Sequence, residues 1–154
     1  MSTRSFAPYQ TTVTDSLQQV YSIFDEIVQP QEDPNASGAL NDARSVGVTN
    51  VELQNVCGAV LPGGAIYNDH EGVLINALAY ELAVDAIKNG GPGQLPRVDV
   101  EKACNSFAAD GLSLPDILAT YALIPIAAFN ILAFEPKTGT EPPIKAYAQK
   151  DVPA

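Results

Sequence analysis

The chain has 154 residues, of which 46% are hydrophobic and 17% are charged, and its formal net charge is −10. A chain of this length can form one domain that buries most of the surface exposed on unfolding. Its eight basic residues are scattered through an acidic chain, which weighs against binding to nucleic acid or to an anionic membrane, because both draw on clustered lysine and arginine.

The N-terminal part of the chain predicts an extended arm followed by a helix. Residues 1–13 have no helical period, and we expect an arm in which Phe6 and Tyr9 are apolar anchors. The first 20 residues contain no continuous apolar run of the kind that directs secretion, so we expect synthesis in the cytoplasm. Residues 14–29 repeat apolar side chains at intervals of three and four, which predicts a helix ended by Pro30.

The middle of the chain predicts a loop and two further helices. Residues 30–49 are rich in Pro, Asp, Asn, Ser and Gly, a composition typical of loops. Asn50 is expected to cap a short helix that ends before Pro62. Residues 68–71 resemble a capping box, and the helix that they would begin runs to Lys88. Apolar residues cover most of its circumference, which predicts a central helix packed on several sides.

The last third of the chain holds its most hydrophobic segment. Asp99 is expected to cap a fourth helix, and residues 114–134 then form an almost uncharged stretch that Pro125 breaks or kinks. The stretch reaches the lower length limit of a transmembrane helix, but its internal proline and the lack of basic flanks favour a core helix packed on residues 68–88. Residues 135–154 contain four prolines and predict a second extended arm.

These patterns together predict an all-α fold. We expect a compact bundle of five to six helices over residues 14–134, with extended arms at residues 1–13 and 135–154, because no alternating run predicts a strand. Cys57 and Cys104 both fall on apolar helical faces. We interpret them as two buried free thiols, and a disulfide between them stays open.

Two groups of residues are candidates for chemistry. His70 is the sole histidine and lies between Asp69 and Glu71, which suggests a metal site or an acid–base pair. Consecutive helical residues point in different directions, so we interpret the triplet as a helix N-terminus. Glu81 and Asp85 lie four residues apart and could also act as acid and base, but we interpret them as the solvent edge of a helix. We therefore expect no catalytic residue, no cofactor and no metal.

The favoured hypothesis is a non-enzymatic structural subunit of a homo-oligomeric assembly of the virion shell, tail or filament type. Its partners would be further copies of itself or other assembly subunits, on which the arms pack. The alternative is a small helical module that binds an apolar ligand, and a third hypothesis is an enzyme that uses Glu81 and Asp85 or His70. The residues expected at the interface between subunits are Phe6, Tyr9, Ile126, Phe129, Phe134, Ile144 and Tyr147.

Overall fold

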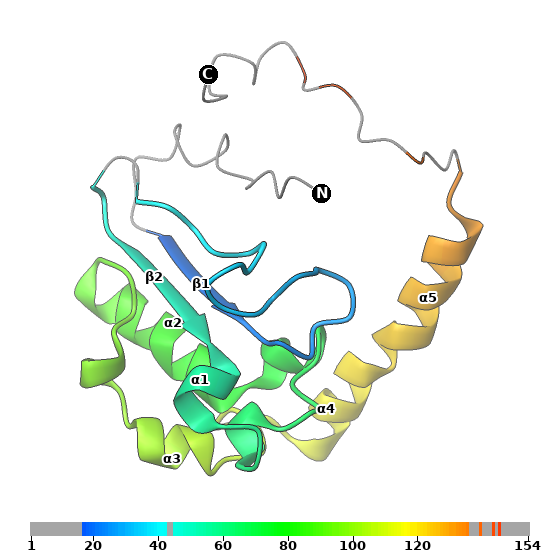
Figure 1. Cartoon of the computed structure of the whole chain (residues 1–154). Helices are drawn as coiled ribbons and strands as arrows, with labels where there is room; N and C mark the ends of the chain where they lie inside the picture. The colour runs from blue at the N-terminus through cyan, green and yellow to red at the C-terminus, as the bar shows by residue number, and fades with distance from the viewer. Residues whose placement is uncertain (1–16, 43–44, 136–138, 140–142, 144, 146–154) are drawn as a thin grey trace.

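A small parallel sheet is the first feature that differs from the prediction. The computed structural model describes residues 17–42, 45–135, 139, 143 and 145. Strands β1 (Leu17–Tyr21) and β2 (Val48–Glu52) pair in parallel, with Val20 opposite Val51 (Figure 1). The described part of the chain combines this sheet with helices, so the prediction of an all-α fold is wrong.

The reason for the error lies in the length of β1. Leu17, Val20 and Tyr21 have the spacing of a helical stripe, yet over five residues that spacing cannot separate a helix from a strand. Residues 17–21 form a strand because they pair with β2. That partner is distant in sequence, so a local pattern does not reveal it. The amide of Leu17 also donates to the carbonyl of Gly47 at 3.0 Å, which extends the pairing beyond the strands.

The described helical elements all follow β2 in the chain. In chain order they are α1 (Leu53–Cys57), η2 (Pro62–Gly64), η3 (Gly72–Ile75), α2 (Ala77–Asn89), η4 (Leu95–Arg97), α3 (Val100–Cys104), α4 (Leu114–Tyr121) and α5 (Leu123–Ala133). The expected capping box at residues 68–71 does not begin a helix. Asn76 caps α2 instead, because its side chain accepts a hydrogen bond from the amide of Ala79 at 3.0 Å.

The core lies between the sheet and helices α1, α2 and α3. Its fully buried side chains include Leu53, Leu78 and Leu82. Cys57 of α1 and Cys104 of α3 are buried in this core, as expected, but they form a disulfide. The favoured interpretation of two free thiols is therefore wrong, and the bond joins two short helices.

Helices α4 and α5 divide where proline predicts a break. Pro125 lies one turn after Tyr121, and α4 ends at Tyr121, as expected from the hydrogen bond and the space that proline removes. At the other end, the side chain of Ser113 and that of Asp116 form a capping box that begins α4. Local chemistry therefore sets both boundaries of α4.

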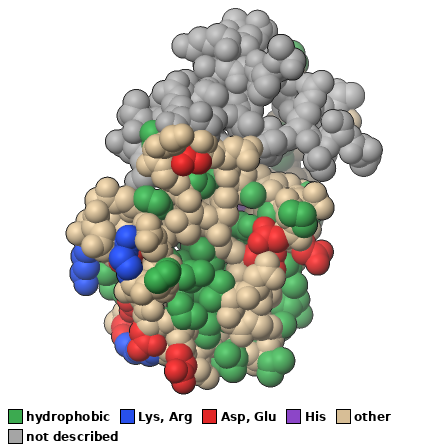
Figure 2. Space-filling view, turned by 60° about the vertical axis from the view of Figure 1, so that its left-hand side comes forward, with side chains coloured by type: hydrophobic (Ala, Val, Ile, Leu, Met, Phe, Trp, Pro, Cys, Tyr) green, Lys and Arg blue, Asp and Glu red, His purple; other side chains and the backbone are tan. Residues whose placement is uncertain are grey.

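The expected role of this segment as a buried core helix is wrong. Only 6% of the most apolar 18-residue window in Leu114–Ala133 is buried, and α5 projects from the body of the molecule (Figure 1). By length and composition alone, this segment could cross a membrane, but one such helix is weak support for a span. Hydrophobic side chains also gather on another face of the molecule (Figure 2).

The expected arms lie largely outside the described residues. Residues 1–13, with Phe6 and Tyr9, fall outside them, as do Ile144 and Tyr147. The three other interface candidates are well exposed, namely Ile126, Phe129 and Phe134. Their contact with another copy of the chain stays a prediction.

Candidate functional site

The sole histidine lies against a buried carboxylate that is distant in sequence. Nδ1 of His70 is 2.9 Å from Oδ2 of Asp25, and the two residues are 45 positions apart. The side chain of Asp25 is 7% exposed, whereas that of His70 is 42% exposed. His70 is therefore the solvent-facing member of the pair, and Asp25 is the member fixed inside the protein.

Backbone amides hold the carboxylate of Asp25 in one orientation. Its Oδ1 accepts hydrogen bonds from the amides of Ile27 at 2.9 Å and Val28 at 2.7 Å. Oδ2 is left to accept from His70, so the proton of a neutral imidazole belongs on Nδ1 and Nε2 carries the free lone pair. Within the described ranges, no hydrogen bond involves Nε2. The geometry thus presents one basic nitrogen outward.

Both members of the pair lie at the carboxyl edge of the parallel sheet. Asp25 is in the loop after β1, and His70 is in the loop that follows β2, α1 and η2. Gln54 connects these loops, because its side-chain amide donates to Oγ of Ser22 at 3.0 Å and to the carbonyl of Gly64 at 3.1 Å. Catalytic and ligand-binding groups of α/β proteins gather at this edge.

Buried amides and a glycine fix the loop that carries His70. Nδ2 of Asn76 donates to Oδ1 of Asn68 at 2.7 Å, and both side chains are almost fully buried. Gly72 approaches the backbone so closely that a Cβ there would lie 2.0 Å from the carbonyl oxygen of Tyr67. The loop therefore returns tightly on itself around His70, and only glycine fits at position 72.

The surroundings favour the protonated form of His70. Its pKa is raised above the ordinary value, chiefly by the hydrogen bond to Asp25. Partial burial acts in the opposite direction, and the negative charges of Asp25, Glu71 and Glu26 add to the increase. An imidazole with an open Nε2 and a fixed carboxylate behind Nδ1 is suited to accept a proton and to be stabilised once it is charged.

The first of the two exposed apolar helices, α4, adjoins this loop. The hydroxyl of Tyr121, at the end of α4, donates to the carbonyl of Tyr67 at 2.6 Å. Burial raises the pKa of Tyr121, and the charges of Asp69 and Glu71 contribute to that increase. Helix α4 is therefore anchored beside the loop of His70, and α5 extends from there.

Asp85 has a different role from the one expected. It is 7% exposed, so it does not belong to a solvent edge. Its carboxylate accepts from Nε of Arg97 at 2.9 Å and from the amide of Gln94 at 3.0 Å, and Asn89 donates to it as well. These bonds lower the pKa of Asp85, with the hydrogen bond from Arg97 as the largest cause. Its oxygens are occupied by a structural ion pair.

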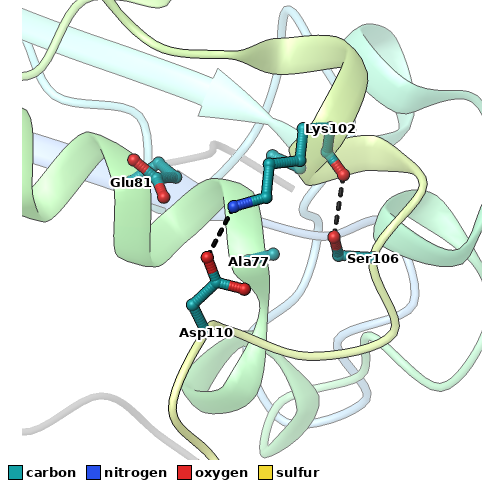
Figure 3. Close-up of a pocket in the computed structure, with 6 residues that line it drawn as sticks. Ala77, Glu81, Lys102, Ser106 and Asp110 are labelled. Atoms are coloured by element: carbon teal, nitrogen blue, oxygen red, sulfur yellow. Dashed lines mark hydrogen bonds and ion pairs between the residues drawn. The ribbon is translucent and has the colours of Figure 1, made fainter.

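Glu81 lies beside a small surface pocket. Ala77, Ser106 and Asp110 are among the other residues that line it, and Lys102 reaches across it to Asp110, with Nζ 2.5 Å from Oδ2 (Figure 3). Among the described residues, no hydrogen bond connects Glu81 or Asp85 with His70. The third hypothesis, in which Glu81 and Asp85 act as acid and base, thus has no geometric support.

Asp25 is the member of the site that the sequence analysis missed. The residue falls inside the predicted helix of residues 14–29, where it looks like one solvated charge among several. A strand prediction for residues 17–21 would have been the useful signal, because a carboxylate shortly after a parallel strand lies at the carboxyl edge of the sheet. His70 was already a candidate residue, but nothing in the local pattern around it indicates Asp25 as its partner.

Comparisons with known proteins point to an enzyme. No protein-family model matches the chain, and no curated protein matches it. A solved structure that does match is the crystal structure of Aspergillus fumigatus lipase B, which has the α/β-hydrolase fold. The two chains are 46% identical with a TM-score of 0.79, and the match covers 88% of this chain and 32% of the lipase chain. The present chain thus spans about a third of that lipase.

This likeness corrects the functional predictions. The prediction of a non-enzymatic subunit of a virion, tail or filament is wrong, because the matched structure is a lipase and the similarity extends over most of the chain. The same match contradicts the prediction that the chain is not an enzyme. It also contradicts the alternative of a purely helical binding module. Asp25 and His70 are 45 residues apart in the chain, so no local pattern connects them.

Proposed function

We propose that His70 and Asp25 are the general base and its orienting carboxylate in an ester hydrolase of the serine–histidine–aspartate type. The observation that carries this proposal is the bond of 2.9 Å between Nδ1 of His70 and the buried, amide-held carboxylate of Asp25. In such enzymes the histidine takes the proton of the nucleophile through Nε2, while the aspartate fixes the tautomer and stabilises the imidazolium.

The nucleophile of this proposal lies outside the described residues. Hydrolases of the α/β type carry their triad in the chain order nucleophile, acid, base, and here Asp25 precedes His70 in agreement with that order. The described residues before Asp25 include one serine, Ser22, which is fully buried. Its Oγ accepts from the amide of Phe24 at 3.1 Å and from Gln54 at 3.0 Å, so it is not presented to His70.

The substrate class follows from the surface beside the base. Helix α4 adjoins the loop of His70, α5 continues from it, and both expose large apolar side chains, among them Leu118, Leu123 and Phe129. The matched structure is a lipase. Esters of apolar carboxylic acids therefore fit this chain best, with the acyl chain against these helices and water delivered at the imidazole.

A chimera tests the catalytic roles directly. The matched segment of Aspergillus fumigatus lipase B is replaced by this chain, and the hydrolysis of p-nitrophenyl esters of increasing acyl length is measured. We expect an active chimera in which His70→Gln or Asp25→Asn lowers kcat by about 10⁴-fold. Glu101→Gln removes an exposed charge on α3 and serves as the control that keeps activity. Activity within tenfold of the parent in His70→Gln would refute the assignment.

A second measurement needs no complementary segment. Because His70 is the sole histidine, its imidazole protons give an unambiguous signal in a proton NMR titration of the chain. We expect a pKa above the ordinary histidine value, which falls when Asp25→Asn removes the charged acceptor. An identical titration curve in the variant would show that the two side chains do not interact in solution.

A further inference from the structure

The structure assigns a second site to the same two loops, a binding site for a divalent cation of the Ca²⁺ type, formed by Glu26, Asp69 and Glu71. One carboxylate oxygen from each residue lies within 4.8 Å of those of the other two. Glu26 comes from the loop after β1, whereas Asp69 and Glu71 flank His70 in the later loop. A bound cation would join the two loops beside the bond between Asp25 and His70.

A buried oxygen without a partner is the independent observation that points to a ligand. Glu71 is 7% exposed, and its Oε2 is buried with no hydrogen-bond partner among the described residues. A buried carboxylate oxygen that lacks a partner costs free energy, and native proteins satisfy nearly all such atoms. Because one carboxylate oxygen of Glu71 lies within 4.8 Å of those of Glu26 and Asp69, a cation at the centre of the three would give this buried carboxylate a partner.

The charges of the cluster favour the same ligand. Three carboxylates at this separation repel one another, and the nearby cationic group is His70, which can offset one charge at most. Two hydrogen bonds are described at the cluster. Asp69 accepts one from the amide of Gly72 at 2.8 Å, and Glu26 accepts a long one, at 3.4 Å, from the amide of His70. Neither of them neutralises charge.

The donor set selects the class of cation. All three donors are carboxylate oxygens, which suit hard cations rather than zinc or copper, whose sites prefer nitrogen and sulfur. The three come from two loops and differ in exposure, from the exposed Glu26 to the buried Glu71. Ca²⁺ accepts such irregular oxygen sets and completes its shell with water, whereas Mg²⁺ demands near-octahedral geometry. With three protein ligands, we expect Kd on the order of 10⁻⁴ to 10⁻³ M.

Terbium luminescence tests the site without any activity assay. Tb³⁺ is the probe, excited through tyrosine, because the chain has six tyrosines and no tryptophan, and the charges of Asp69 and Glu71 act on Tyr121. We expect the luminescence to saturate with Tb³⁺ and to fall when Ca²⁺ displaces the bound Tb³⁺. In Glu71→Gln the affinity for Tb³⁺ should be at least tenfold lower. Glu101→Gln removes a charge elsewhere and should bind Tb³⁺ like the parent. Equal affinity in the parent and in Glu71→Gln would overturn the site.

Thermal unfolding separates a cation site from a merely structural role of Glu71. At 10 mM Ca²⁺ and a Kd near 10⁻³ M, binding should raise Tm of the parent by roughly 3 to 6 °C. Glu71→Gln relieves the repulsion, so it should raise Tm without Ca²⁺ and remove the response to Ca²⁺. An equal rise of Tm with NaCl at matched ionic strength, or an unchanged Ca²⁺ response in the variant, would overturn the proposal. Neither measurement depends on hydrolase activity, so a negative result for the cation site can be told apart from a negative result for the proposed function.

Discussion

Reduction of the disulfide between Cys57 and Cys104 should remove a large part of the stability of the fold. The bond closes a loop with a sequence separation of 47 residues, and that loop includes His70. The chain-entropy relation for a loop of this length gives about 4 kcal/mol of stabilisation, through the unfolded ensemble. With a urea dependence of about 2 kcal/mol per M for a domain of this size, the midpoint of unfolding should fall by about 2 M.

The assay compares oxidised and reduced wild-type protein in urea, followed by circular dichroism. This comparison keeps both sulfur atoms in the core, so it isolates the cross-link. The double variant Cys57→Ala, Cys104→Ala is measured beside it, and it should lose somewhat more, because it also removes two buried side-chain atoms. The imidazole signal of His70 in the NMR spectrum should also change on reduction, because His70 lies in the loop that the disulfide closes.

A midpoint that shifts by less than about 0.5 M on reduction would refute this reasoning. It would mean either that the unfolded chain is already compact between positions 57 and 104, or that the two helices do not depend on the bond. The slope of the transition distinguishes these cases, because residual structure in the unfolded state lowers the slope.

Two further substitutions probe the site loop and the buried ion pair. Gly72→Ala places a methyl group against the carbonyl of Tyr67, so it should lower the free energy of unfolding by about 1–3 kcal/mol and shift the NMR signal of His70. Gly91→Ala is the control: a Cβ there has no neighbour within 4 Å, so neither quantity should change. Asp85→Asn should destabilise the protein at neutral pH, measured by urea unfolding. Because Arg97 lowers the pKa of Asp85 in the folded state, the stability difference between wild type and variant should be constant above about pH 5 and shrink as the pH falls below about 4.

Local chemistry was the part of the fold that the sequence could predict. The side chain of Asp99 caps α3 by accepting from the amide of Lys102 at 3.0 Å, as expected. The division at Pro125 was also correct, because each of these features acts within one turn of chain. Cysteine burial was correct for the same kind of reason, since both residues lie on the apolar faces of short helices.

Pairing across the chain was the part that could not be predicted. β1 is a strand because β2 pairs with it, and Asp25 is part of a site because His70 contacts it from 45 residues away. The local sequence pattern around each partner does not show which distant residue it contacts. The apolar segment at residues 114–134 shows a related limit, because hydrophobicity indicates that a surface tends to be covered but not what covers it.

Two features that first seem unrelated fit one proposal. His70 presents Nε2 with no hydrogen-bond partner among the described residues, while α5, anchored through α4 beside the same loop, exposes an apolar surface. A general base has no chemical use without a nucleophile at Nε2, and a large exposed apolar surface is unfavourable unless something apolar covers it. A hydrolase in which another segment supplies the nucleophile, and an apolar acyl chain lies along α5, satisfies both requirements at the same place.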